Sequence, residues 1–168
     1  MSAGFFFSAD EDQKLAATNS DFWESLIEHI RGDWWDEPPG SILDVGCHYG
    51  GLLCKLIDVW KPRRAWGIEP LAPARRRATA RLGSLAPDVR VMDVPEWSTV
   101  PDAAFDLVPC HEVLYLEPDL GAFMASIHRV LSRSGRAYLV LGCHAENPVW
   151  VHWKPRLEAL GHRVYDHR

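Results

Sequence analysis

Short apolar runs alternate with segments of helical character along most of this chain. The runs that predict strands lie at residues 41–45, 65–69, 89–94, 105–110 and 137–142. Segments with helical spacing or turn residues lie between them, at 52–57, 71–82 and 127–136. This alternation predicts parallel strands joined by helices. The expected fold class is α/β, a Rossmann-like, doubly wound, mostly parallel sheet in a three-layer α/β/α arrangement.

Residues 10–35 precede the first strand and predict an added N-terminal helix. Phe22, Leu26, Ile27 and Ile30 recur at helical spacing, and the Asn-Ser-Asp sequence at 19–21 offers starting caps. The helix either packs against the sheet or covers a cofactor or substrate, and the sequence leaves both roles open. A single domain is expected, with residues 1–40 as this helix and its connection and residues 41–168 as the core.

The first strand ends in a glycine-rich turn that carries the strongest chemical signal. Asp44, Gly46 and Gly50 surround this turn, and a helix follows at once, so free backbone amides face whatever lies over the turn. Glu69 ends the second strand, about 20 residues further on, which is the spacing at which an acid reaches ribose hydroxyls. The pattern indicates a nucleotide-binding corner.

Composition narrows the function classes. The chain has 168 residues, 47% hydrophobic and 24% charged, which is enough for a sizeable core without disulfides. Its net charge of −5 gives no general attraction to nucleic acid or anionic membrane, so small or cationic substrates are favoured. The sequence shows no secretory signal and no apolar run long enough to span a bilayer, so we expect a cytoplasmic protein, either a monomer or a homodimer.

From about residue 42 to residue 160 the chain resembles the class I S-adenosylmethionine-dependent methyltransferases. Their first strand ends in an acidic residue and three alternating glycines, matched here by Asp44, Gly46 and Gly50, with His48 at the middle glycine. The resemblance implies S-adenosylmethionine as cofactor, with Glu69 on the ribose and Asp93 near the adenine amino group. The cofactor-binding residues expected on this basis are Asp44, Gly46, Cys47, His48, Gly50, Glu69, Pro70, Asp93, Val94 and Cys110.

The resemblance also implies where the acceptor substrate binds. His111 follows the fourth strand at the rim where doubly wound sheets bind ligands, so it is the leading candidate for a catalytic residue. Glu112 and Tyr115 are weaker candidates, expected at the start of the next helix. A base is optional, because a sulfonium is already a good leaving group and positioning does most of the work. A small-molecule substrate is expected, with a wall formed by Tyr115, His144, Trp150 and Trp153.

The C-terminal region is predicted to be a shortened version of that fold. Asn147 and Pro148 predict a helix start, Pro155 interrupts or restarts this helix, and Gly161 ends it before a sixth strand at 162–165. On this assignment no residues remain for the family's seventh strand, and either a reduced fold or a truncated chain would account for that.

Two other functional classes compete with methyl transfer. A non-catalytic or regulatory S-adenosylmethionine-binding module is compatible with His48 in the turn and with the short C-terminus. A dinucleotide-dependent oxidoreductase is disfavoured, because the turn lacks the Gly-x-Gly-x-x-Gly spacing. Three Cys-His pairs, at 47–48, 110–111 and 143–144, follow strands, but without the usual metal-ligand spacings we expect no metal.

Overall fold

The computed structural model describes residues 9–33, 37–142 and 150–159. Its central element is a five-stranded sheet in the order β3-β2-β1-β4-β5, in which every neighbouring pair is parallel. The strands are β1 (Ser41–Val45), β2 (Arg64–Ile68), β3 (Asp88–Met92), β4 (Phe105–His111) and β5 (Leu131–Val140). The predicted parallel α/β sheet is confirmed.

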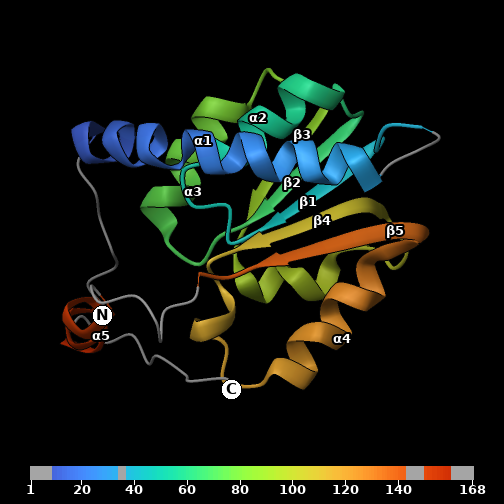
Figure 1. Cartoon of the computed structure of the whole chain (residues 1–168). Coiled ribbons are helices and arrows are strands. Elements are labelled where there is room, and N and C mark those ends of the chain that lie inside the picture. Colours follow the sequence, from blue (N-terminus) through green and yellow to red (C-terminus); the bar gives the residue numbers. More distant parts are fainter. Residues whose placement is uncertain (1–8, 34–36, 143–149, 160–168) are drawn as a thin grey trace.

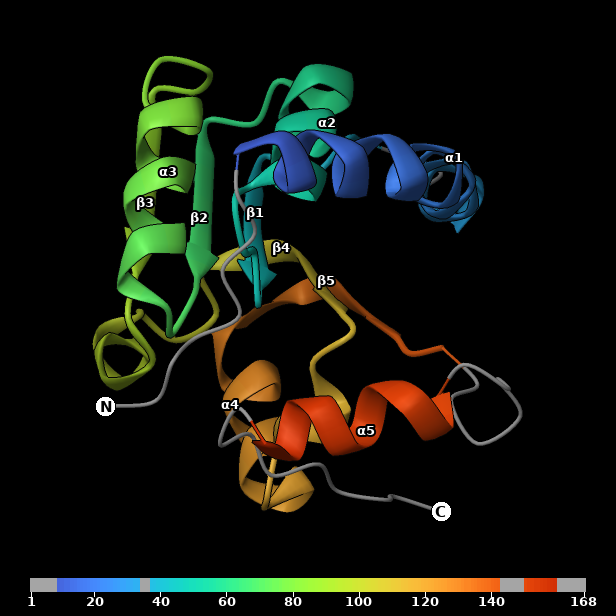
Figure 2. The same cartoon turned by 90° about the vertical axis from the view of Figure 1, so that its left-hand side faces the viewer.

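Helices cover both faces of this sheet, which gives the predicted three layers. On one face lie α1 (Ala9–Asp33), α2 (Gly51–Trp60) and α3 (Ala72–Leu82), and on the other lie α4 (Leu120–Val130) and the short 3-10 helix η1 (Val94–Thr99) (Figures 1 and 2). Alternate residues of each strand point to opposite faces. Ile42 and Leu107 therefore pack under α1, α2 and α3, whereas Leu43 and Val108 pack against α4 and η1.

The N-terminal helix is present but begins earlier than its sequence predicts. Residues 19–21, expected as starting caps, lie inside α1, which begins at Ala9. The Ser20 hydroxyl donates to Glu24 one turn along the helix, at 3.0 Å, and so does not cap a helix end. Leu26, Ile27 and Ile30 are buried beside α2, as their spacing indicates, but Phe22 is 41% exposed.

Two boundaries in the second half of the chain also differ from expectation. The fifth strand begins at Leu131, not Ala137, because Leu131 already pairs with Phe105 of β4. A register shift follows, and regular pairing of the two strands starts at Arg136 and Leu107. The segment after β4 forms the 3-10 helix η2 (Leu114–Leu116) and not the start of a long helix. The α4 helix begins only at Leu120, where the Asp119 carboxylate accepts from the Ala122 amide at 2.9 Å.

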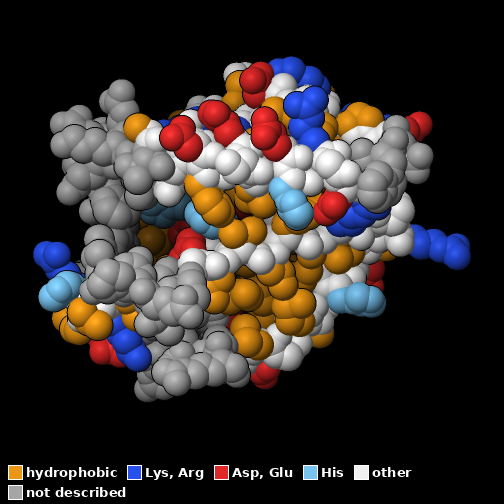
Figure 3. All heavy atoms as spheres, viewed as in Figure 1, with side chains coloured by type: hydrophobic (Ala, Val, Ile, Leu, Met, Phe, Trp, Pro, Cys, Tyr) orange, Lys and Arg blue, Asp and Glu red, His pale blue; other side chains and the backbone are white. Residues whose placement is uncertain are grey.

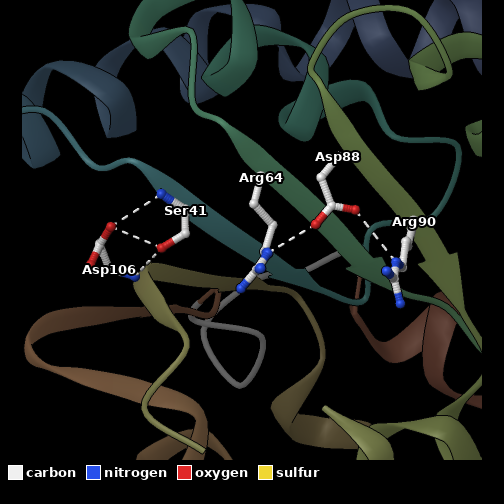
Figure 4. Close-up of polar contacts among 5 residues, drawn as sticks. All are labelled: Ser41, Arg64, Asp88, Arg90 and Asp106. Carbon is white, nitrogen blue, oxygen red and sulfur yellow. Dashed lines mark hydrogen bonds and ion pairs between the residues drawn. The ribbon is translucent and has the colours of Figure 1, made fainter. Parts of the chain in front are cut away.

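Polar contacts hold the strands at the end of the sheet away from the glycine turn (Figure 4). One Asp106 carboxylate oxygen accepts from the Ser41 amide at 3.1 Å and from the Ser41 hydroxyl at 2.8 Å. The other oxygen accepts from Ser132 at 2.9 Å, so Asp106 joins the starts of β1, β4 and β5. Arg64 donates to Asp88 at 3.0 Å across β2 and β3. These bonds help to fix the strand register, which determines which residues lie together at the opposite end of the sheet, where the strands have their carboxyl ends.

The last described helix, α5 (Trp150–Ala159), lies on the same side of the sheet as α4 (Figure 2). It continues through Pro155, which therefore does not interrupt it. The predicted helix start at 147–148 and strand at 162–165 lie outside the described residues. Among the described strands, β5 forms one edge of the sheet and pairs with β4. On the face of the molecule shown in Figure 3, hydrophobic side chains gather between α1 and α4. No helix in the described ranges is long and apolar enough to cross a membrane.

Candidate functional site

The turn between β1 and α2 is fixed largely by its own backbone. The amides of Gly46 and Cys47 both donate to the carbonyl of Ile68, at 2.8 and 3.0 Å, which ties the turn to the end of β2. Gly46 has φ +79° and Gly50 φ +76°, conformations that glycine adopts at little cost. A Cβ on Gly46 would lie 2.2 Å from Val113 Cγ2, so a glycine is required for a second reason. The segment after β4 packs directly onto the turn.

Glu69 connects this turn to the start of α3. Its carboxylate is buried and accepts from the His48 amide at 2.9 Å and from the Leu71 amide at 2.8 Å. Burial raises the pKa of Glu69, while the hydrogen bonds from the Leu71 and His48 backbone oppose that effect. A carboxylate has about four acceptor positions, so Glu69 retains acceptor capacity for a ligand.

Asp44 lies at the end of β1 with an acceptor that the protein does not use. The residue is 2% exposed, and among the described residues its Oδ2 atom has no hydrogen-bond partner. Burial, and then the neighbouring Glu69 carboxylate, raise the pKa of Asp44 to about 7. A buried polar atom without a partner costs free energy, so this oxygen is suited to a ligand that donates a hydrogen bond or carries positive charge.

A cleft of about 1360 Å³ opens over these two carboxylates. Beyond the turn, side chains from α1, from the segment after β4 and from α5 line it, among them Phe22, Trp23, His111, Tyr115 and Trp150. The sheet thus places an acidic, glycine-rich corner and an aromatic wall around one space.

The structure brings most, but not all, of the predicted cofactor residues to this cleft. Those that line it are Asp44, Gly46, Cys47, His48, Glu69, Pro70 and Val94. Gly50 packs against α3 instead, with Leu82 Cδ1 3.0 Å from the position of a Cβ. Asp93 pairs with Arg75 at 2.9 Å and accepts from the Val94 amide at the start of η1. Cys110 is fully buried in the sheet.

Both cysteines at this rim are protonated thiols buried in the protein. Burial raises the pKa of Cys47 and of Cys110 well above the ordinary range, and the nearby Asp44 carboxylate adds to both shifts. Neither is therefore suited to act as a thiolate ligand or nucleophile. In the described part of the chain, no group of three or more His, Cys, Asp or Glu residues is placed to hold a metal ion.

His111 lies at the end of β4 in contact with the N-terminal helix. Its Nδ1 atom accepts from Trp23 Nε1–H at 3.5 Å, and the Phe22 ring stacks on its imidazole with centroids 4.9 Å apart. Burial lowers the pKa of His111, and the Glu112 carboxylate opposes part of that effect.

The predicted substrate wall is only partly described. The Tyr115 and Trp150 rings meet edge to face, with centroids 5.6 Å apart, and both line the cleft. Burial, and then the Glu112 charge, raise the pKa of Tyr115 to about 12, so this phenol stays protonated. Tyr115 belongs to η2, and Glu112 has φ +60° and precedes that helix, so neither begins α4 as expected. His144 lies outside the described residues, and the side chain of Trp153 is not described.

Sequence reasoning missed Trp23, Val113 and Arg75. Trp23 follows Phe22 on α1. Two adjacent aromatic residues beside the apolar stripe of a helix cannot both point into the core, and this pattern could have indicated that one of them lies in a binding site. Arg75 donates to the carbonyls of Glu69 and Pro70, at 2.7 and 2.6 Å, as well as pairing with Asp93. No local pattern separates it from the other arginines of α3.

Comparisons with known proteins agree with this geometry. A family model described as a methyltransferase domain matches residues 43–139. The ubiquinone biosynthesis O-methyltransferase of Pseudomonas paraeruginosa is 30% identical over 121 residues, which is 67% of this chain and 50% of that protein. Nodulation protein S of Sinorhizobium fredii is 30% identical over 124 residues, covering 74% of this chain and 56% of that protein. The chain therefore spans about half the length of these curated relatives.

A solved structure shares the fold. The geranyl diphosphate C-methyltransferase of Streptomyces coelicolor, in complex with S-adenosylhomocysteine, aligns with a TM-score of 0.65 at 18% identity, over 89% of this chain and 54% of that one. The matched family model includes the glycine turn, Glu69 and His111 within its span. From its sheet order, its glycine turn and these matches, the chain belongs to the class I S-adenosylmethionine-dependent methyltransferase family.

Proposed function

We propose that this chain transfers a methyl group from S-adenosylmethionine to a nucleophilic atom of a small molecule by in-line displacement. The main support for the proposal is that one cleft is lined on one side by the acidic glycine turn and on the other by aromatic side chains. The corner with Asp44 and Glu69 suits a cofactor with donor groups and positive charge, and the aromatic wall suits an apolar acceptor.

The residues at the corner fit the cofactor that the family uses. The unpartnered Asp44 Oδ2 and the remaining acceptor positions of Glu69 match a ligand with hydroxyl and ammonium donors. In this proposal Glu69 holds the ribose, the backbone of Gly46, Cys47 and His48 borders the methionine part, and Pro70 and Val94 border the adenine. When bound, S-adenosylmethionine supplies an electrophilic methyl group on a good leaving group.

Gly50, Asp93 and Cys110 have supporting roles in this proposal. Gly50 lets α2 approach Leu82 of α3, and Asp93 orients the start of η1 beside Val94. Cys110 fills the sheet next to Val45, its partner in the β1–β4 ladder. Each acts on the cleft through a neighbour that lines it.

The acceptor side supports an apolar, ring-bearing substrate. Phe22, Trp23, Tyr115 and Trp150 offer aromatic faces and edges, which bind flat apolar groups through stacked or edge-to-face contacts. The names of the similar Pseudomonas and Streptomyces proteins denote an O-methyltransferase and a C-methyltransferase, so oxygen and carbon nucleophiles are both candidates.

Calorimetry and a transfer assay test the proposal together. We expect the purified protein to bind S-adenosylhomocysteine but not NAD⁺, and to transfer an isotope-labelled methyl group from S-adenosylmethionine to members of a panel of hydroxylated ring compounds. Binding of NAD⁺ alone would favour the oxidoreductase. Binding of S-adenosylhomocysteine with no transfer to any acceptor would favour a non-catalytic module.

The Trp150→Leu variant tests the proposed division of the cleft into a cofactor side and an acceptor side. It should change the range of acceptors while leaving the affinity for S-adenosylhomocysteine within about 0.3 kcal/mol, because the Trp150 ring meets Tyr115 on the aromatic side of the cleft. Trp60→Leu, at a partly buried position of α2 that packs against the core, is the matched control and should leave the acceptor range unchanged. An equal loss of cofactor and acceptor binding in Trp150→Leu would refute the division.

A further inference from the structure

The contact between α1 and His111 joins residues 88 positions apart in the sequence. Trp23 donates its indole N–H to His111 Nδ1 at 3.5 Å, and Phe22, the preceding residue, stacks on the imidazole at an interplanar angle of 22°. The helix thus holds one nitrogen and one face of His111. The uncharged side chains Phe22 and Trp23 are its partners from α1, and the charged group that acts on it is Glu112, from its own segment.

Gly51 keeps the Trp23 indole in this position. A Cβ built on Gly51 would lie only 2.6 Å from the outer edge of the Trp23 ring, at Cη2. The Trp23 indole can therefore pack against Gly51, the first residue of α2, only because Gly51 has no side chain. The partly buried Trp23 side chain thus lies between Gly51, beside the glycine turn, and His111.

The direction of this hydrogen bond determines which imidazole nitrogen carries a proton. A nitrogen that accepts from an indole N–H is unprotonated, and a neutral imidazole carries its single proton on the other nitrogen, which here is Nε2. No hydrogen bond from Nε2 occurs among the described residues. This N–H group is the one that His111 has left to offer a ligand.

This arrangement is the opposite of a histidine general base. In a general base, the nitrogen that faces away from the substrate donates to a carboxylate or carbonyl, which stabilises the imidazolium that forms. In His111 that position is occupied by a donor. Protonation of both nitrogens would place two N–H groups against each other, Trp23 Nε1–H and His111 Nδ1–H.

We propose that Trp23 is a positioning residue that holds His111 as the Nε2–H tautomer, so that His111 donates a hydrogen bond to the methyl-accepting substrate and does not remove its proton. This inference rests on the proposed function. It narrows the substrate class to molecules with an acceptor oxygen, a carbonyl or an ionised hydroxyl, near the atom that is methylated. Such an acceptor loses its proton to solvent or is already ionised on binding.

Nitrogen NMR of protein labelled with ¹⁵N-histidine tests the tautomer without any ligand. Long-range proton–nitrogen spectra distinguish protonated from unprotonated ring nitrogens, and His111→Asn identifies the signals of His111. We expect Nδ1 unprotonated and Nε2 protonated in the parent. In Trp23→Phe, which keeps the ring against Gly51 but removes the donor, both tautomers should appear and the pKa of His111 should rise by about 0.5 to 1 unit.

The matched control is Trp60→Phe, which removes an indole N–H from α2 and should leave the His111 signals unchanged. A parent spectrum with the proton on Nδ1 would overturn the proposal even if Trp23→Phe failed to fold. Identical His111 signals and pKa in the parent and Trp23→Phe would also overturn it. Calorimetry with S-adenosylhomocysteine is independent of these spectra, so failure of the proposed function is distinguishable from failure of the tautomer assignment.

Discussion

The two sides of the cleft are built in different ways. The proposed cofactor side lies mainly between residues 44 and 71, with Val94 at its border, and its contacts involve backbone amides of Gly46, Cys47, His48 and Leu71. The acceptor side combines side chains from opposite ends of the chain, from Phe22 on α1 to Trp150 on α5. Backbone geometry thus defines one side, and side-chain packing between distant elements defines the other.

This difference predicts different responses to substitution. On the cofactor side, the hydrogen bonds that shape the site also hold β1, β2 and α3 together, so stability and binding should change together. On the acceptor side, a side chain can change while the turn remains, so specificity should change with cofactor affinity preserved. Substitutions on the two sides of the cleft test this contrast.

Gly46→Ala should lower the free energy of unfolding by about 2 to 4 kcal/mol. Two costs combine, a left-handed backbone at φ +79° and a new Cβ 2.2 Å from Val113 Cγ2. Chemical denaturation measures the change. Gly32→Ala is the matched control, since nothing lies within 4 Å of its Cβ position in α1, and it should stabilise the protein by about 0.5 kcal/mol. A loss below about 1 kcal/mol in Gly46→Ala would contradict the close packing of Val113.

Glu69→Ala should weaken binding of S-adenosylhomocysteine by about 1.5 to 3 kcal/mol, the scale of hydrogen bonds to a charged group. Stability should fall as well, because the amides of His48 and Leu71 lose their acceptor. Asp93→Ala is the comparison and should cost less affinity, because its carboxylate pairs with Arg75 and does not line the cleft. Calorimetry in which Asp93→Ala costs as much as Glu69→Ala would reverse the assignment.

Asp44 should make the parent less stable as the pH rises from about 4 to 7. The pKa of its buried carboxyl, about 7, lies above the ordinary value of 3.8, so the folded protein keeps a proton that the unfolded chain loses in this window. The favourable contribution is complete below pH 4 and is lost toward pH 7. Relative to Asp44→Asn, the parent should therefore lose on the order of 3 kcal/mol across this window.

Denaturation of both proteins at several pH values measures this difference. Asp58→Asn is the control at an exposed position on α2, where the hydrogen bond to Lys61 lowers the pKa of Asp58. Its contribution is lost only on acidification below about pH 4, as the pH falls through that lowered value, so the difference between the parent and Asp58→Asn should stay nearly constant from pH 4 to 7. A constant difference between the parent and Asp44→Asn from pH 4 to 7 would show that Asp44 is ionised in the folded protein.

His48→Gly should change stability by less than about 0.5 kcal/mol. Relief of a left-handed backbone at φ +48° contributes about 1 kcal/mol, and the greater freedom of glycine in the unfolded chain offsets most of it. Lys61→Gly, also at φ +48° but on the far end of α2, is the matched control. Affinity for S-adenosylhomocysteine should be equal in the parent and His48→Gly. A pH dependence of affinity that disappears in the variant would make the His48 side chain part of the site.

Much of this molecule was predictable from local sequence. The strand and helix alternation, the glycine turn and Glu69 depend on residues close together in the chain, so periodicity and spacing encode them. The errors occurred where tertiary contacts override local signals. Residues 19–21 lie inside α1, a helix that packs on α2 through Leu26, Ile27 and Ile30. The β5 strand begins at Leu131 because Phe105 pairs with it across the sheet.

The sequence alone was enough to identify the family, the glycine turn with its two acidic residues, and the position of His111 at the end of β4. Three features depend on the tertiary structure: Trp23 contacts His111, Val113 packs on Gly46, and Asp93 and Cys110 do not line the cleft. The physical reason is that a strand or helix period specifies which face a side chain is on. Which distant side chain meets that face depends on sheet register and helix packing, which the whole fold sets.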